Sequence, residues 1–151
     1  ATWLGQSAGL PVCLVAGREP LRNGTVHLAA RESHLVCESA SAVTLADDPA
    51  DALHRPSVDI LFTSLAATVS GGVAVLLTGM GRDGANGLLA LRRAGWWTIA
   101  QDRASSVVWG MPGEAVRIGA AVETLGVGEI GMAIGRALAR RAAGTVRGGV
   151  R

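Results

Sequence analysis

The chain has 151 residues, of which 49% are hydrophobic and 17% charged, and its formal net charge is +2. This size and apolar content allow a single domain with a substantial core and exclude an intrinsically disordered segment. No apolar run reaches the roughly 18 residues that a transmembrane helix needs, and the first residues lack the basic and apolar regions of a signal peptide, so we expect no membrane insertion.

The first third of the chain is rich in short strand-like segments. Four of them are expected to form strands: residues 11–16, 25–29, 34–37 and 42–45. An Asn23-Gly24 pair, which favours the tight turn of a β-hairpin, precedes the second segment. We therefore predict an antiparallel hairpin region over residues 11–46. Cys13 and Cys37 lie in apolar stretches without the spacing of a metal site or a disulfide framework, so we expect two free thiols in a cytoplasmic protein.

The pattern changes at Pro56, where helices and strands begin to alternate. Ser57 can cap a helix that carries apolar residues at helical spacing over residues 58–69. The elements expected after it are a buried strand over 73–77, a helix over 85–94, a strand over 97–100, a helix over 112–118, a strand over 121–125 and an amphipathic helix from about residue 130. This alternation is typical of an α/β fold with a doubly wound parallel sheet, to which the antiparallel hairpin region is added at one edge.

We assign residues 1–143 to one domain and residues 144–151 to a basic tail. All 14 basic residues of the chain are arginines, and several of them gather near this end. A solvated tail is the favoured interpretation, because the body of the chain shows neither a basic stripe nor interleaved aromatic residues. No binding to nucleic acid is therefore expected.

The segment richest in chemistry is a glycine-rich turn between the buried strand and the following helix. Residues 79–84 have the G-x-G-x-x-G spacing of a dinucleotide-binding fingerprint, and Asp102 follows at about the distance of the ribose-binding acid. Asp83, however, stands inside the turn, where its carboxylate would repel a pyrophosphate and compete for the helix N-terminus. A dinucleotide-binding domain is therefore the less favoured alternative.

Asp83 has two interpretations. It can cap the helix over residues 85–94 or form an Asp-Gly turn, and the residue alone favours this structural role. A carboxylate between glycines at the carboxyl end of a parallel strand is also suited to orient a catalytic histidine, provided that a rigid turn holds it and that it stays ionised.

Four ordered segments of the chain carry a family resemblance. They are residues 55–64 (Arg-Pro-Ser-Val-Asp-Ile-Leu-Phe-Thr-Ser), 77–85 (Leu-Thr-Gly-Met-Gly-Arg-Asp-Gly-Ala), 99–102 (Ile-Ala-Gln-Asp) and 105–112 (Ser-Ser-Val-Val-Trp-Gly-Met-Pro). Together they resemble the CheB-type protein-glutamate methylesterases of bacterial chemotaxis, and the second is that family's most diagnostic stretch. Weaker similarity extends back through residues 24–29, so the resemblance covers nearly the whole chain.

The resemblance implies an enzyme that hydrolyses glutamate γ-methyl esters on methyl-accepting chemoreceptors and often deamidates receptor glutamines. Such enzymes use a Ser-His-Asp triad and no cofactor or metal. Asp83 matches the triad aspartate, and Met80 matches a residue whose backbone N–H helps to form the oxyanion hole. In this family a receiver domain in the same protein commonly controls access to the active site.

The sequence also departs from the family's pattern. The segments that hold the serine and the catalytic histidine are expected N-terminal to Ala1, so we expect a sheet incomplete at its N-terminus and no turnover by this segment alone. His27, His34 and His54 are expected to be structural or solvent-facing. Trp96-Trp97 replaces small residues of the family; packing between helix and strand is favoured over lining a cleft. A catalytically inactive homologue that binds receptors or regulators remains an alternative.

Overall fold

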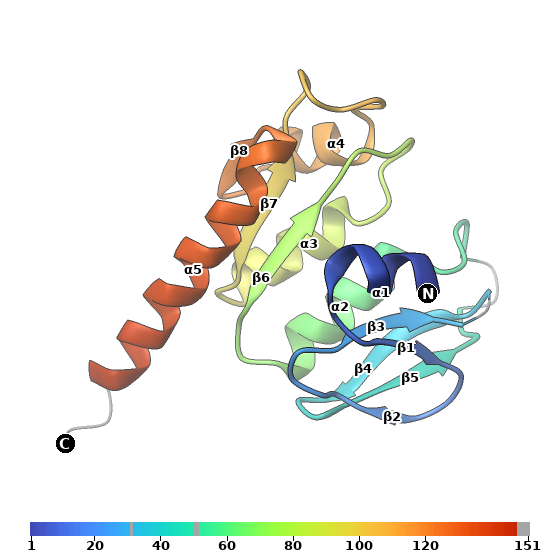
Figure 1. The fold of residues 1–151 in the computed structure, drawn as a ribbon. Helices are drawn as coiled ribbons and strands as arrows, with labels where there is room; N and C mark the ends of the chain where they lie inside the picture. The colour runs from blue at the N-terminus through green and yellow to red at the C-terminus, as the bar shows by residue number, and fades with distance from the viewer. Residues whose placement is uncertain (31, 50–51, 148–151) are drawn as a thin grey trace.

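The computed structural model describes residues 1–30, 32–49 and 52–147, with side chains as far as residue 143. The N-terminal third forms two small sheets, and the rest of the described chain builds a parallel sheet with helices on both faces (Figure 1). Residues 144–147 continue the last helix, whereas residues 148–151 of the predicted basic tail lie outside the described residues.

The C-terminal sheet has three parallel strands in the order β6 (Val73–Leu76), β7 (Trp97–Gln101) and β8 (Glu123–Leu125). Helix α3 (Ala85–Arg93) connects the first two strands, and helix α4 (Met111–Arg117) connects the last two. This βαβ succession is the one that alternating apolar segments produce. The predicted α/β fold with a parallel sheet is therefore confirmed.

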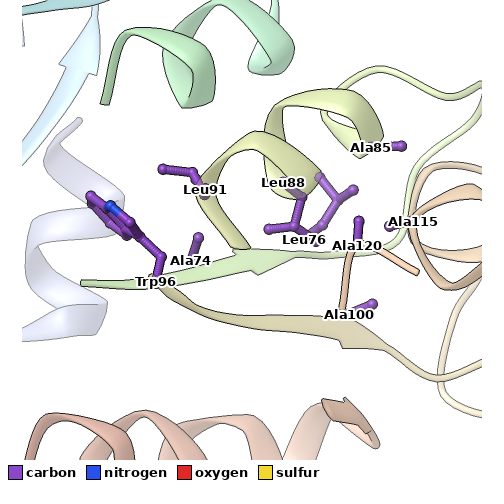
Figure 2. Close-up of a cluster of buried hydrophobic side chains, with 9 residues drawn as sticks. All are labelled: Ala74, Leu76, Ala85, Leu88, Leu91, Trp96, Ala100, Ala115 and Ala120. Carbon is purple, nitrogen blue, oxygen red and sulfur yellow. The ribbon is translucent and has the colours of Figure 1, made fainter. Parts of the chain in front are cut away.

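The main core lies between this sheet and helices α3 and α4. Leu88 and Leu91 of α3 are fully buried; Leu88 lies beside Leu76 of the sheet, and Leu91 extends toward Trp96 (Figure 2). The other buried members of the cluster are mostly small: Ala74, Ala85, Trp96, Ala100, Ala115 and Ala120. Full burial of one leucine stabilises a fold by roughly 1.5–3 kcal/mol. The two leucines therefore anchor the helix that follows the glycine-rich turn.

Helix α5 (Val127–Arg147) covers the opposite face of the sheet (Figures 1 and 2). Ile130 and Ala133 of this helix pack against Ile99 of β7, which is fully buried. Their spacing of three positions places both side chains on the same side of the helix. Helices on both faces of the sheet complete the layered arrangement that the sequence predicts.

Trp96, just before β7, packs in the main core, whereas Trp97, the first residue of β7, packs in the cluster that Ile99 forms with helix α5. Trp96 is 9% exposed in the main core, and its Nε1–H donates to the Val69 carbonyl oxygen at 3.2 Å. The Trp97 Nε1–H donates to Glu123 Oε1 at 2.6 Å, and the Arg140 guanidinium carbon lies 5.5 Å from its ring centre. The favoured interpretation of this pair as helix–strand packing is confirmed.

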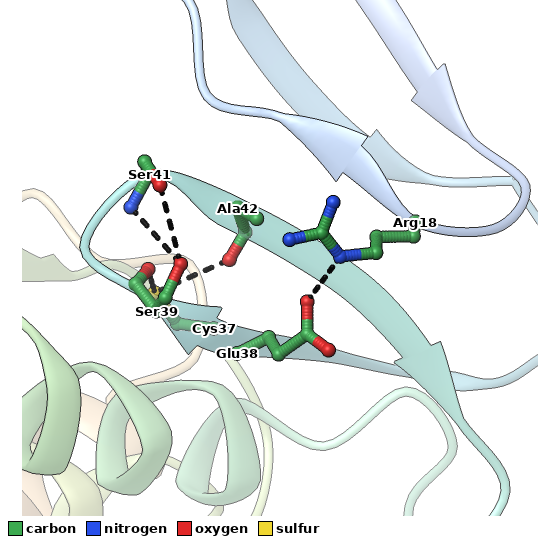
Figure 3. A network of polar contacts seen from close by, with 6 residues as sticks. All are labelled: Arg18, Cys37, Glu38, Ser39, Ser41 and Ala42. Carbon is green, nitrogen blue, oxygen red and sulfur yellow. Dashed lines mark hydrogen bonds and ion pairs between the residues drawn. The ribbon is translucent and has the colours of Figure 1, made fainter.

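Part of the predicted antiparallel region is present in the N-terminal third. Strands β4 (His34–Ser39) and β5 (Ala42–Ala46) form the expected hairpin, and the short β2 (Glu19–Pro20) pairs antiparallel with β5. Figure 3 shows the turn of this hairpin, where the Cys37 Sγ–H donates to the Ser39 carbonyl oxygen at 3.0 Å. These three strands form one sheet in the order β2-β5-β4.

The hairpin predicted around Asn23-Gly24 is wrong. Strands β1 (Val12–Val15) and β3 (Val26–Ala29) are neighbours, but they run parallel, with Val12 opposite Val26. A turn does form there, closed by a hydrogen bond from Thr25 N–H to the Arg22 carbonyl oxygen at 3.3 Å. This turn leads from β2 into β3, and these two strands are not paired with each other. The parallel neighbours β1 and β3 are instead joined by a longer connection, because a two-residue turn cannot link parallel strands.

Both cysteines are free thiols, as the sequence predicts; Cys37 is buried and Cys13 half-buried. Near Cys37, Arg18 pairs with Glu38 at 2.6 Å (Figure 3). Both side chains of this pair are exposed, so it contributes little stability. The strength of the hairpin sheet therefore comes from its pairing and from its contact with the next helix.

Helix α2 (Val58–Thr68) connects the two parts of the molecule, because it packs against β4 on one side and α3 on the other. Its Leu61 joins the small core of the hairpin region, and its Phe62 joins the main core. A short helix, α1 (Thr2–Ala8), precedes β1 and was not predicted from the sequence. Among the described residues, no helix is long and apolar enough to span a lipid bilayer.

Candidate functional site

The candidate site is built around residues 77–84, the loop that leaves the carboxyl end of β6 and leads into α3. Ligands and catalytic groups collect at this end of parallel strands. A second loop, residues 102–110, braces the first. The Gly79 N–H donates to the Val108 carbonyl oxygen at 3.0 Å, and the Gly79 carbonyl oxygen accepts from Met111 N–H at 2.8 Å. These bonds fix the backbone of the glycine-rich loop.

Gly110 allows the two loops to approach at backbone distance. A Cβ atom at this position would lie 2.7 Å from the Gly79 carbonyl oxygen and 2.8 Å from the Gly81 nitrogen. Both distances are too short for a side chain, and neither backbone atom can rotate away. The bracing of the glycine-rich loop therefore requires a glycine here.

Met80 lies at the tip of the braced loop and is 82% exposed. Its side chain adds nothing to the core, so the interest of the position is in its backbone. Among the described residues, none accepts a hydrogen bond from the Met80 N–H. The described part of the chain therefore makes no use of this donor.

Asp83 is held by the first turn of α2 rather than by α3. Its Oδ1 accepts hydrogen bonds from the Ser57 hydroxyl at 2.8 Å and from the Asp59 N–H at 3.0 Å. Its Oδ2 accepts from the Val58 N–H at 2.8 Å. Gly84 precedes α3 without a side-chain cap, and Asp83 satisfies the N-terminus of a different helix, so the alternative in which Asp83 caps the helix over residues 85–94 is wrong.

Counted over the described residues, the Asp83 carboxylate accepts three hydrogen bonds. Two carboxylate oxygens offer about four lone-pair sites. Oδ1 uses both of its sites, and Oδ2 uses one of its two. By this count, Oδ2 keeps one lone pair that no donor among the described residues uses.

The same contacts keep Asp83 ionised. Its partial burial alone would raise the pKa of the carboxyl group. Hydrogen bonds from the N–H groups of Val58 and Asp59 and from the Ser57 hydroxyl, together with a smaller electrostatic effect of His54, outweigh this effect and lower the pKa of Asp83 below its ordinary value. Asp83 therefore carries a negative charge at neutral pH.

Asp59 makes the reciprocal contact, from α2 to the start of α3. Its Oδ1 accepts from the Gly87 N–H at 2.6 Å. A Cβ atom on Gly87 would lie 2.6 Å from the Phe62 Cβ and 3.0 Å from the Asp59 backbone, so glycine permits this close crossing of the helices. Burial, together with the nearby Asp83 charge, raises the pKa of Asp59 against the opposing hydrogen bond from Gly87. Two neighbouring carboxylates thus differ in how readily they ionise.

Ser57 and Asp59 were not predicted as site residues from the sequence. Ser57 was expected only as the cap of α2, and it does accept a hydrogen bond from the Ile60 N–H at 3.4 Å. The available signal was the resemblance of residues 55–64 to a family motif. A motif that includes polar residues beyond those a helix start requires can indicate a contact with another loop.

Asp83 lines an open cavity of about 400 Å³ at the end of the sheet. The other residues around this cavity are Ala52, Leu53, His54, Ser57, Asp59, Arg82 and Asn86. His54 is exposed there and His34 is fully buried in β4, which fits the prediction that each is structural or solvent-facing. The cavity gives a donor from solvent or from another segment access to the region of Asp83.

The dinucleotide alternative finds no support in this geometry. The Gly87 N–H at the start of α3, where a pyrophosphate would bind, already donates to a carboxylate. Asp102, the expected ribose-binding acid, instead accepts from the Ser105 N–H at 2.9 Å and from the Ser105 hydroxyl at 2.6 Å. The helix start and Asp102, the two features that resembled the fingerprint, are therefore both engaged in hydrogen bonds within the protein.

A comparison with protein-family models matches residues 1–134 to the family described as CheB methylesterase. The chain belongs to the CheB methylesterase family. The match includes both loops of the site and the first turn of α2.

Known CheB relatives agree with this assignment. A Mesorhizobium japonicum protein named protein-glutamate methylesterase/protein-glutamine glutaminase is 49% identical over 133 residues, which are 87% of this chain and 39% of the relative. A Cupriavidus metallidurans protein of the same name, numbered 2, is 48% identical over 83% of this chain and 37% of its own length. The chain thus spans about two fifths of the length of these relatives.

A solved structure is similar to this CheB-family chain in fold. The crystal structure of the Thermotoga maritima CheB methylesterase catalytic domain superposes with a TM-score of 0.81 at 28% sequence identity. The similarity covers 89% of this chain and 73% of the Thermotoga chain. The described fold is therefore the major part of a CheB catalytic domain.

Proposed function

We propose that this chain is the aspartate-bearing part of a protein-glutamate methylesterase, in which Asp83 is the acid of a Ser-His-Asp triad. The substrates are glutamate γ-methyl esters on chemoreceptors, and receptor glutamines are a second substrate. The observation that carries the proposal is the Asp83 carboxylate, which three donors hold at the carboxyl end of β6 beside an open cavity.

The state of Asp83 suits the task of a triad acid. Such a residue stays ionised, accepts a hydrogen bond from the histidine and so holds the imidazole in the tautomer that can take the serine proton. Because the pKa of Asp83 is lowered, its carboxylate is ionised at neutral pH, as this role requires. Three donors on one helix turn supply a fixed orientation.

Met80 contributes a backbone donor in this proposal. Attack of the serine oxygen on the γ-carbonyl carbon moves negative charge onto the carbonyl oxygen, and donors placed for that charge lower the barrier. The free Met80 N–H, on a loop braced at both sides, meets the requirement for a donor that does not reorganise. Removal of one such donor typically slows a reaction by about 10²–10³-fold.

The two half-reactions follow from these roles. The histidine takes the serine proton as the C–O bond forms, then returns it to the methoxy oxygen, so that methanol leaves and a glutamyl ester of the serine remains. Water then attacks this ester with the same proton transfers, which releases the glutamate carboxylate and restores the serine. Asp83 remains ionised throughout and stabilises the imidazolium in each step.

Methanol release by the natural full-length protein tests the proposal. With a methyl-esterified receptor fragment as substrate, we expect methanol in proportion to enzyme and time. Pretreatment with a fluorophosphonate, which modifies activated serines, should abolish the release. A protein that binds the receptor fragment but releases no methanol would refute the enzyme and favour an inactive receptor-binding homologue.

A further inference from the structure

Ser57 connects the first turn of α2 to the acid of the proposed triad. Its side chain is nearly buried, and its hydroxyl donates to Asp83 Oδ1 at 2.8 Å. The same oxygen accepts from the Ile60 N–H at 3.4 Å, so its acceptor role is taken and its proton is directed to the carboxylate. Both hydrogen-bonding roles of this hydroxyl are therefore assigned.

The backbone N–H of Ser57 is itself hydrogen-bonded to a histidine of the hairpin region. The Nδ1 atom of His34, a fully buried residue of β4, accepts from the Ser57 N–H at 3.1 Å. A neutral imidazole that accepts at Nδ1 carries its proton at Nε2. Among the described residues, no group accepts a hydrogen bond from His34 Nε2. The contact through Nδ1 therefore ties the start of α2 to the hairpin region.

The two contacts form a line from the antiparallel sheet to the cavity. His34 fixes the backbone of Ser57, and Ser57 fixes one oxygen of the Asp83 carboxylate. The N–H groups of Val58 and Asp59, from the same helix turn, complete the set of donors. Rotation of the carboxylate would break several of these bonds at once, so its free lone pair keeps one direction.

We propose that Ser57 is a positioning residue of the methylesterase, which fixes the Asp83 carboxylate so that its free Oδ2 lone pair points at the catalytic histidine. The inference rests on the proposed function, because Ser57 is assigned an effect that passes through Asp83 alone. The competing account is that Ser57 is only the N-cap of α2.

A double-mutant cycle in the natural full-length protein separates the two accounts, with methanol release as the readout. Ser57→Ala should lower kcat by about tenfold to a hundredfold with little change in KM, as small displacements of a catalytic group do. Ser57→Thr keeps the hydroxyl and the cap, and should restore most of the rate. In an Asp83→Asn background, Ser57→Ala should change kcat by less than about twofold, because the group it positions is already lost.

Thr63→Ala is the matched control, since it removes a hydroxyl from an exposed position of the same helix. It should keep the kcat of the wild type, and thermal unfolding of each variant gives the folded fraction for normalisation. A wild-type kcat in Ser57→Ala, or the same loss in both backgrounds, would overturn the proposal and leave Ser57 as a helix cap. The proposed function fails separately, if Asp83→Asn alone retains turnover.

Discussion

Replacing Asp83 with asparagine should weaken the fold as well as the chemistry, because the carboxylate closes the N-terminus of α2. Asparagine Oδ1 can still accept from the Ser57 hydroxyl and the Asp59 N–H. Its amide nitrogen, however, would face the Val58 N–H, donor against donor. One lost bond to a charged group costs about 1.5–3 kcal/mol, and the loss of a helix cap about 1 kcal/mol. We expect a decrease of about 2 kcal/mol in the free energy of unfolding.

Urea unfolding of the wild type and Asp83→Asn at several pH values measures this decrease. The folded-state pKa of Asp83 is lowered, so its contribution is fully present above the ordinary carboxyl pKa of about 4 and is lost as the pH falls through the lowered value. The difference between the proteins should therefore shrink in acid. Equal stability at pH 7, or a difference that does not change with pH, would refute the reasoning.

Three further outcomes are expected. Gly110→Ala should cost about 1–3 kcal/mol of stability and displace the loop that carries Met80, which chemical denaturation and methanol release of the full-length protein would detect; unchanged values would contradict the close approach. Asp59→Asn keeps an acceptor for the Gly87 N–H but removes a carboxyl group whose pKa is raised in the folded state. The variant should therefore unfold at a higher urea concentration than the wild type at pH 7 and lose this advantage in acid, where the wild-type carboxyl group is protonated. Lower stability of the variant at pH 7 would contradict the effect of burial on Asp59. Thiol titration of denatured, unreduced 1–151 should find both Cys13 and Cys37; a count of none would contradict two free thiols.

The parallel sheet could be predicted because its signals are local. Val73–Leu76 and Trp97–Gln101 are short apolar segments bounded by glycines and helical periods, and each forms a strand within one residue of the prediction. The pairing of β1 with β3 could not be predicted in this way. Asn23-Gly24 does form a turn, but which strands become neighbours depends on contacts far along the chain.

The candidate site shows the same division. The sequence placed Asp83 in the turn after β6, because glycines and a following helix mark such turns. It could not show that the carboxylate crosses to α2, since the residues it meets at Ser57 and Val58 are 26 and 25 positions away. Nor could it show the return contact from Asp59 to Gly87, because that bond depends on the close crossing of two helices.

The most direct test of the central claim is the kcat of Asp83→Asn in the natural full-length protein, measured on a methyl-esterified receptor fragment and corrected for folded fraction. An asparagine cannot hold the catalytic histidine in the tautomer that accepts the serine proton. The account predicts a fall in kcat of about 10⁴-fold with little change in KM. A kcat within a few-fold of the wild type would show that Asp83 is a helix cap and not the acid of a triad.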